Sequence, residues 1–132
     1  MHTPLSKKML IKPGSRVLVL NAPDGYSEKL EPLPPGAVRC SAVGSTCNVV
    51  WLFVRNQAEI DSWFPRVFHQ VSPGGILWVS YPKRTAPGVI TDINRDTGWD
   101  AVVAAGWQGV TQIAVDETWS ALRFRPKSEI KK

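Results

Sequence analysis

The stretch Arg16-Val-Leu-Val-Leu-Asn-Ala-Pro-Asp-Gly-Tyr26 decides the fold. Its first half, Val17 to Leu20, is a continuous apolar run, which is typical of a strand covered on both faces by helices. Pro23 ends the strand because it has no backbone N–H to donate, and Asp24 has the position and charge of a helix cap. The stretch therefore predicts a strand, a tight turn and a helix from about Gly25 to Leu30. In open α/β sheets this junction is where ligands bind.

Further apolar runs bounded by turn residues predict the other strands, at 37–41, 49–54, 76–79, 110–115 and 118–124. The run 49–54 is the most apolar and is expected at the centre of the sheet, whereas 37–41 is expected at an edge. Ser72-Pro-Gly-Gly75 predicts a turn. Asp116-Glu117 predicts a short hairpin turn between the two closing strands.

Two longer helices are expected between these strands. Asn56 and Glu59 have capping-box spacing, and a set of apolar residues follows at helical spacing: Ile60, Trp63, Phe64, Val67, Phe68 and Val71. Pro65 falls inside this pattern and predicts a kink or a split. A later helix, capped by Thr91 or Asp92 and ended by Gly106, is expected to bury the apolar residues Ile93, Trp99, Val102 and Val103. A short N-terminal helix that uses Leu5, Met9, Leu10 and Ile11 is expected to cross a sheet edge.

Strands that alternate with helices predict a mostly parallel sheet with right-handed crossovers. The expected fold class is α/β, a single Rossmann-like domain over 16–126 with helices on both faces and a C-terminal antiparallel hairpin. Residues 1–15 form an N-terminal arm and 127–132 a basic tail. A chain of 132 residues is long enough for one such domain.

The charge distribution and the spacing of the cysteines argue against several kinds of binding site. The net charge is +5, and the last ten residues hold five basic residues against one acidic residue. This distribution indicates a basic tail, and it argues against a nucleic-acid groove, which needs a basic stripe on a structured face. Cys40 and Cys47 have no zinc-site spacing and are interpreted as small core residues in a reducing compartment. No apolar run has the length of a membrane span, so we expect a cytoplasmic protein without a metal.

Several segments together resemble a family of small bacterial proteins of unknown function with a class I S-adenosylmethionine-dependent methyltransferase-like fold. They are Val-Leu-Asn-Ala-Pro-Asp-Gly-Tyr26, Leu-Phe-Val-Arg55, Tyr-Pro-Lys83, Thr-Asp-Ile-Asn-Arg-Asp96 and Asp116-Glu-Thr-Trp-Ser-Ala-Leu-Arg123. The likeness spans Met9 to Pro126. It implies the methyltransferase sheet, shortened by one strand–helix unit after the second strand.

The chain departs from working methyltransferases at the two places where they hold the cofactor. Their turn after the first strand is rich in glycine, whereas here it is Asn21-Ala-Pro-Asp-Gly25, in which side chains and a proline stand where backbone would approach a ligand. The ribose-binding acid that ends their second strand is replaced here by Cys40-Ser41. The resemblance therefore predicts a pseudoenzyme without standard S-adenosylmethionine binding.

Residues at the carboxyl ends of the strands are the candidate site. Asn21, Asp24, Gly25 and Tyr26 are the candidates for contact with any cofactor, and a second set could bind a small anionic molecule: Arg55, Tyr81, Lys83, Asp92, Asn94 and Arg95. The alternative for these groups is a set of helix caps and surface ion pairs.

Three hypotheses stay open. The first is a module that binds a small molecule or a protein. The second is a small S-adenosylmethionine-dependent methyltransferase with a non-standard cofactor loop, in which Asp24 and Lys83 contribute to ligand binding. The third is a homodimer formed through a sheet edge or through the hairpin that carries Trp107 and Trp119.

Overall fold

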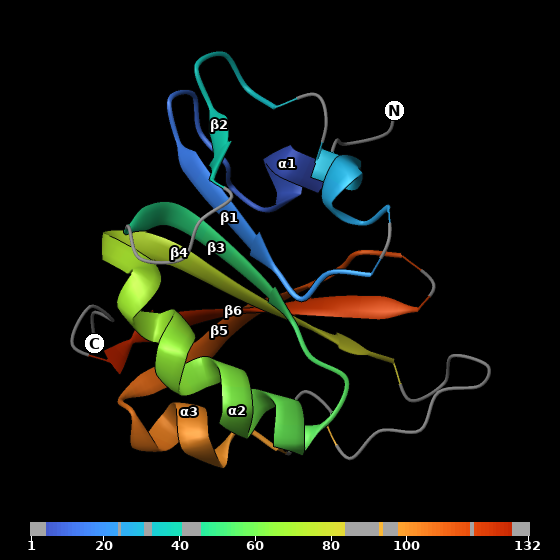
Figure 1. Cartoon of the computed structure of the whole chain (residues 1–132), viewed down its shortest axis with the longest axis vertical. Helices are drawn as coiled ribbons and strands as arrows, with labels where there is room; N and C mark the ends of the chain where they lie inside the picture. Colours follow the sequence, from blue (N-terminus) through green and yellow to red (C-terminus); the bar gives the residue numbers. More distant parts are fainter. Residues whose placement is uncertain are drawn as a thin grey trace.

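The computed structural model describes residues 5–23, 25–30, 33–40, 46–83, 93, 98–116 and 118–127. The elements in chain order are α1 (Leu5–Lys8), β1 (Arg16–Leu20), η1 (Ser27–Leu30), β2 (Val38–Cys40), β3 (Cys47–Phe53), α2 (Gln57–Val67), η2 (Phe68–Gln70), β4 (Val71–Pro82), α3 (Asp100–Ala104), β5 (Trp107–Ala114) and β6 (Trp119–Pro126). Here η marks a 3₁₀ helix. Figure 1 shows a twisted sheet with helices on either side of it.

The six strands form one sheet in the order β2-β1-β3-β4-β6-β5. Strands β2, β1, β3 and β4 run parallel to one another, whereas β6 is antiparallel to both β4 and β5. The predicted fold class, a mostly parallel α/β sheet with a C-terminal antiparallel pair, is therefore confirmed. The short strand β2 lies at an edge and β3 lies inside the sheet, as predicted.

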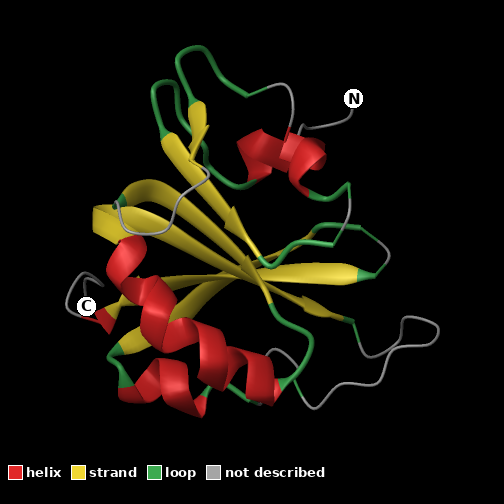
Figure 2. Ribbon diagram, in the orientation of Figure 1, coloured by secondary structure: helices red, strands yellow, loops and turns green. Residues whose placement is uncertain are grey.

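Each face of the sheet has its own apolar core. Helices α2 and α3 cover one face with Ile60, Phe64 and Val102, and α1 and η1 cover the other with Met9 and Leu30; Figure 2 shows the two groups of helices on opposite sides of the strands. Strand β3 contributes residues to both cores, and all but one of its seven residues are buried. A continuous apolar run is what a strand covered on both faces requires.

Helix α2 begins as the sequence predicts. The Asn56 Oδ1 atom accepts a hydrogen bond from the Glu59 backbone N–H at 2.9 Å, which satisfies one of the donors that a helix start leaves open. The helix continues through Pro65 to Val67 and then tightens into η2. Of the two outcomes expected at Pro65, the split does not occur.

The predicted turn at Ser72–Gly75 is wrong, because these residues lie within the twelve-residue strand β4. The register of β4 against β3 shifts between Cys47 and Val49, so the segment is an irregularity within the strand. A Cβ atom on Gly75 would lie 2.8 Å from the Ser72 carbonyl oxygen, so the close approach of backbone explains the glycine.

The predicted helices around the sheet are shorter than expected. The helix expected at 25–30 is the 3₁₀ helix η1, and α3 begins only at Asp100. Val103 does not point inward, since its exposed fraction is 48%. Gly106 ends α3 at a φ of +92°, as predicted. The proposed caps Thr91 and Asp92 lie outside the described residues.

Residues near both ends of the described chain are part of the folded domain. Met9 is fully buried on a face of the sheet, not across an edge, and its carbonyl oxygen accepts a hydrogen bond from the Trp78 Nε1–H at 2.9 Å. Arg123 lies in β6, within the predicted strand 118–124, and β6 continues beyond that range through Arg125 to Pro126. No helix within the described ranges is long and apolar enough to cross a membrane.

Candidate functional site

The carboxyl ends of the parallel strands meet at one edge of the sheet. Strands β1, β3 and β4 end there at Leu20, Phe53 and Pro82, and the hairpin between β5 and β6 turns at the same edge. Because β1 lies between β2 and β3, the chain leaves β1 toward one side and returns to its other side. The topological switch point between β1 and β3 is therefore where the sequence predicts it, and Asn21 directly follows β1 at this point.

Asn21 ties the end of β1 to the neighbouring elements. Its backbone has a φ of +59°, in the left-handed region that asparagine tolerates better than most residues. Its Nδ2 group donates to the Phe53 carbonyl oxygen at 2.8 Å and lies 3.4 Å from the Glu59 Oε1 atom. The same Oε1 atom accepts from the Arg55 backbone N–H at 2.7 Å and lies 3.5 Å from the Arg55 Nη1 atom. The side chains at the switch point therefore bond to one another.

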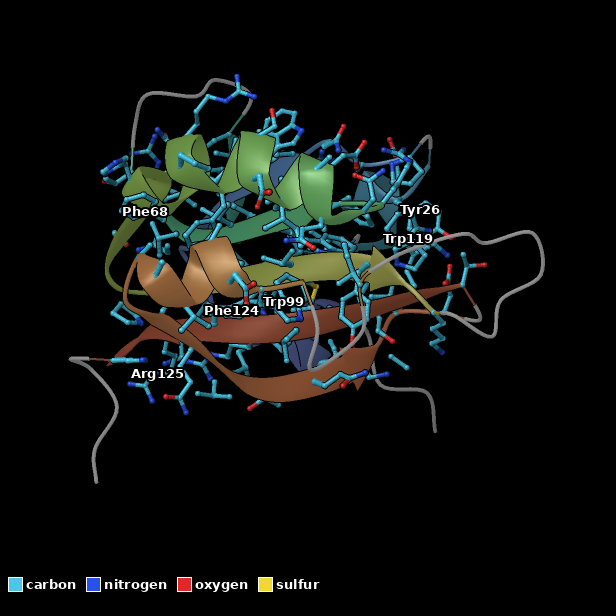
Figure 3. All side chains as sticks on the ribbon, turned by 90° about the horizontal axis from the view of Figure 1, so that it is seen from below. Tyr26, Phe68, Trp99, Trp119, Phe124 and Arg125 are labelled. Atoms are coloured by element: carbon cyan, nitrogen blue, oxygen red, sulfur yellow. The ribbon has the colours of Figure 1, made fainter. Side chains whose placement is uncertain are left out.

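Tyr26 lies in the loop after β1, and its partly buried side chain packs against the core on the α1 side of the sheet. Its ring packs edge-on against Phe53 and Trp119, with centroids 5.7 Å and 6.0 Å away, and Figure 3 shows Tyr26 and Trp119 together at one end of the molecule. The Tyr26 hydroxyl donates to the Asp116 Oδ2 atom at 2.5 Å. Asp116 Oδ1 accepts from the backbone N–H groups of Thr118 and Trp119, each at 2.8 Å. The loop after β1 is thus joined to the β5–β6 hairpin across the end of β3.

The electrostatics of this pair favour the neutral phenol beside the charged carboxylate. Burial, followed by the hydrogen bond to Asp116 and its charge, raises the pKa of Tyr26 to about 12. Burial on its own would raise the pKa of Asp116. The Tyr26 hydroxyl, the two backbone donors and the Lys29 ammonium outweigh it, so that the pKa of Asp116 is lowered. Lys29 Nζ lies 3.9 Å from Asp116 Oδ2 and 5.0 Å from the centre of the Tyr26 ring.

Among the described residues, the predicted site residues Tyr26 and Tyr81 pack in different cores, on opposite faces of the sheet. Tyr81 is 4% exposed and belongs to the core beneath α2 and α3, whereas Tyr26 packs on the opposite core. Arg55 pairs with Glu59, and the backbone N–H of Lys83 donates to the Thr118 carbonyl oxygen at 2.7 Å. Asp24, Asp92, Asn94 and Arg95 lie outside the described residues.

Gly25 is the one glycine of the predicted cofactor loop, and it is exposed at a φ of +83°. A Cβ atom there would meet nothing within 4 Å, so its conformation, and not crowding, explains the glycine.

At the end of β2 stands Cys40, partly exposed, with its side chain packed against the α2-side core. Burial, with the nearby Cys40 thiol as the next cause, raises the pKa of Cys47 to about 11, which keeps this thiol protonated. Neither cysteine forms a disulfide; Cys47 is a member of the α2-side core and Cys40 packs against it, in agreement with their interpretation as small core residues. Among the described residues no group of His, Cys, Asp and Glu could hold a metal ion.

The sequence did not indicate three residues that organise this edge. Asp116 was assigned to a turn, Glu59 only to a helix cap, and Trp119 only to a dimer surface. The capping-box spacing could have placed Glu59 near the end of β3. Nothing local connects Asp116 to Tyr26, because ninety positions separate them.

Solved structures share this arrangement over nearly the whole chain. DhpI in its complex with SAH aligns with a TM-score of 0.61 at 12% identity, covering 93% of this chain and 82% of that one. A SAM-dependent methyltransferase from Geobacter sulfurreducens, solved with S-adenosyl-L-homocysteine, aligns with a TM-score of 0.52 at 13% identity over 92% and 88% of the two chains. The chain has the fold of the class I methyltransferases.

Because the sequence identities are this low, the alignments support a shared fold and nothing further. The N-methyltransferase NodS from Bradyrhizobium japonicum gives the same result, with a TM-score of 0.50 at 13% identity over 85% of each chain. No protein-family model matches the chain, and no curated protein matches it. Within this fold, the Asn21 contacts at the switch point and the Tyr26–Asp116 hydrogen bond connect the loop after β1 to the neighbouring elements.

Proposed function

We propose that this chain is a methyltransferase-like module that lacks standard S-adenosylmethionine binding and that works by binding a small molecule or a protein. The observation that supports this proposal is a pair of side-chain hydrogen bonds at the carboxyl edge, from Asn21 to the Phe53 carbonyl oxygen and from Tyr26 to Asp116. Both draw the loop after β1 onto the fold.

A cofactor in the usual pose needs backbone N–H groups and empty space beside this loop. Pro23 has no N–H to offer, and the Asn21 amide is already bonded to the ends of β3 and α2. The strand that would supply a ribose-binding acid ends in Cys40, which has no carboxylate. Opening this edge would require breaking hydrogen bonds that the fold itself makes.

Isothermal titration calorimetry with S-adenosylmethionine and with S-adenosylhomocysteine tests the proposal. The expected result is no saturable heat with either compound at concentrations up to about 1 mM, the weak limit of specific binding. Asn21→Ala serves as a comparison, because it removes the amide from the switch point while Pro23 stays. A micromolar affinity of the unmodified chain for either compound contradicts the proposal.

A small methyltransferase with a non-standard cofactor loop is the second candidate. It is supported by neighbours solved with S-adenosyl-L-homocysteine and by the exposed Gly25, whose surroundings are open. In this case Asp24→Ala and Lys83→Ala should weaken cofactor binding without lowering the unfolding temperature. Affinity equal to that of the unmodified chain in both variants counts against this candidate.

A further inference from the structure

A cavity of about 400 Å³ opens at the far end of the sheet from β1 and β2, between α3 and the β5–β6 pair. This volume lies within the range of small-molecule sites, which is about 300–1,000 Å³. The residues that line it are Trp99, Val103, Trp107, Gln108, Gly109, Val110, Thr111, Gln112, Leu122, Phe124 and Lys127. None of these residues belongs to the carboxyl-edge site, so the cavity is a separate feature of the fold.

The cavity lies beside α3, a helix of only five residues. Among the described residues, several of β5 that line it are exposed. The cavity floor consists of large buried side chains, among them Trp107 and Phe124, which are 7% and 1% exposed; Figure 3 places Trp99 and Phe124 beside α3 and β6. At the mouth, Val103 and Val110 are 48% and 39% exposed, although they are apolar. Exposed apolar side chains around a concave aromatic floor are typical of a binding site.

The charged residue in the cavity lining indicates the chemical class of the ligand. Lys127 is the one charged residue among the described residues that line the cavity, and a hydrogen bond from its backbone N–H to the Gly106 carbonyl oxygen, 2.8 Å long, fixes its position at the end of α3. Gln108 and Gln112 add amide groups. We propose that this cavity binds a small aromatic anion, with its ring on the apolar floor and its acidic group toward Lys127. This proposal does not depend on whether the carboxyl edge binds S-adenosylmethionine.

A second copy of the chain is the competing occupant, since β5 is an edge strand whose eight residues carry no charge. Uncharged edges invite pairing with another strand. Two observations favour the small molecule. The β5–β6 register shifts between Gly109 and Thr111, and such an irregularity protects an edge. The chain also has a net charge of +5, which opposes self-association.

The probe for the test is 1-anilinonaphthalene-8-sulfonate, an aromatic sulfonate, and its neutral counterpart is N-phenyl-1-naphthylamine. Each is titrated against the folded chain while probe fluorescence and energy transfer from tryptophan are recorded. We expect the sulfonate to saturate at about one molecule per chain. Lys127→Gln should weaken the sulfonate by about three- to fivefold, as for an exposed ion pair, and leave the neutral probe unchanged.

Val103→Glu and Val38→Glu form the matched pair of variants. Both valines are about half exposed, but Val38 lies in β2 at the opposite edge of the sheet. Val103→Glu places a carboxylate at the cavity mouth and should weaken the sulfonate about tenfold or more, since an unpaired like charge must be desolvated. Val38→Glu should have no effect. Near-ultraviolet circular dichroism establishes that both variants keep their tertiary structure.

Three results would overturn the proposal. One is binding that does not saturate, and another is an equal loss in Val38→Glu and Val103→Glu. The third is a mass of two chains by light scattering that Thr111→Lys reduces to one, together with probe binding that appears only in the monomeric variant. That third result would assign the surface to a second copy of the chain.

Discussion

Replacing Tyr26 by Phe removes the hydroxyl that joins the loop after β1 to Asp116 and leaves the ring in place. A hydrogen bond to a charged group contributes about 1.5–3 kcal/mol; the rise in the Tyr26 pKa to about 12 has burial as its largest cause and does not measure this bond. Tyr26 is only partly buried, and the side chains of Asp116 and Lys29 are 25% and 41% exposed, so solvent screening reduces this figure. We expect Tyr26→Phe to lower the free energy of unfolding by about 1–2 kcal/mol at neutral pH.

The direction of each pKa shift determines whether its contribution to stability is lost as the pH rises or as the pH falls. Because the pKa of Tyr26 is higher in the folded chain than in the unfolded chain, its contribution is fully present below pH 10 and disappears as the pH rises toward about 12. The pKa of Asp116 is lowered, so its contribution is present above the ordinary value of 3.8 and is lost as the pH falls through the folded value. The difference between Tyr26→Phe and the unmodified chain should therefore be constant from about pH 5 to 9 and decrease as the pH rises from 10 toward about 12.

Urea unfolding followed by circular dichroism measures these differences, and ultraviolet absorbance of the phenolate measures the pKa directly. The chain has two tyrosines, so subtracting the Tyr26→Phe titration isolates the Tyr26 signal. Asp116→Asn should lower the Tyr26 pKa only part of the way to 10, because burial is the larger cause and remains. An unchanged Tyr26 pKa in Asp116→Asn, or a stability difference that persists undiminished at pH 11, would refute the reasoning.

Five further substitutions, at four positions, test local features by the same unfolding measurement. Gly75→Ala should cost about 2–3 kcal/mol, because its Cβ would lie 2.8 Å from the Ser72 carbonyl oxygen, whereas Gly25→Ala, in open space at positive φ, should cost about 1–2 kcal/mol. Equal costs would contradict the close approach at Gly75. Asn56→Ala should cost about 1 kcal/mol through the lost helix cap. Asn21→Ala should cost about 2–3 kcal/mol and Asn21→Gly about 1 kcal/mol, because only glycine keeps the positive φ without strain; a reversed order would exclude backbone strain at this position.

The sequence predicts most of the sheet because the relevant signals are local. Val17–Leu20 and Val49–Val54 are apolar runs bounded by turn residues, and both are strands in the structure. The apolar spacing and the Asn56 cap predict α2 for the same reason. In each case a window of about a dozen residues contains the pattern that determines the element.

The features that sequence reasoning missed depend on partners elsewhere in the chain. Pro73-Gly74-Gly75 has the composition of a turn, but the neighbouring strand β3 keeps this segment in β4 with a shifted register. Val103 fits a buried helical position, yet α3 ends before it could cover β5. The contact between Tyr26 and Asp116 follows from the topology, which brings the loop after β1 and the β5–β6 hairpin to the same edge.

Asn21 connects the architecture of the sheet with the proposed loss of cofactor binding. The backbone at the end of β1 is left-handed, a conformation that glycine adopts without strain. Asparagine is among the few other residues that tolerate this conformation, and at a φ of +59° it keeps the backbone in the left-handed region. Its side chain, however, bonds to the Phe53 carbonyl oxygen and reaches Glu59. Asn21 thus combines a left-handed turn after β1 with side-chain contacts inside the protein, and these contacts are the basis of the proposed loss of cofactor binding.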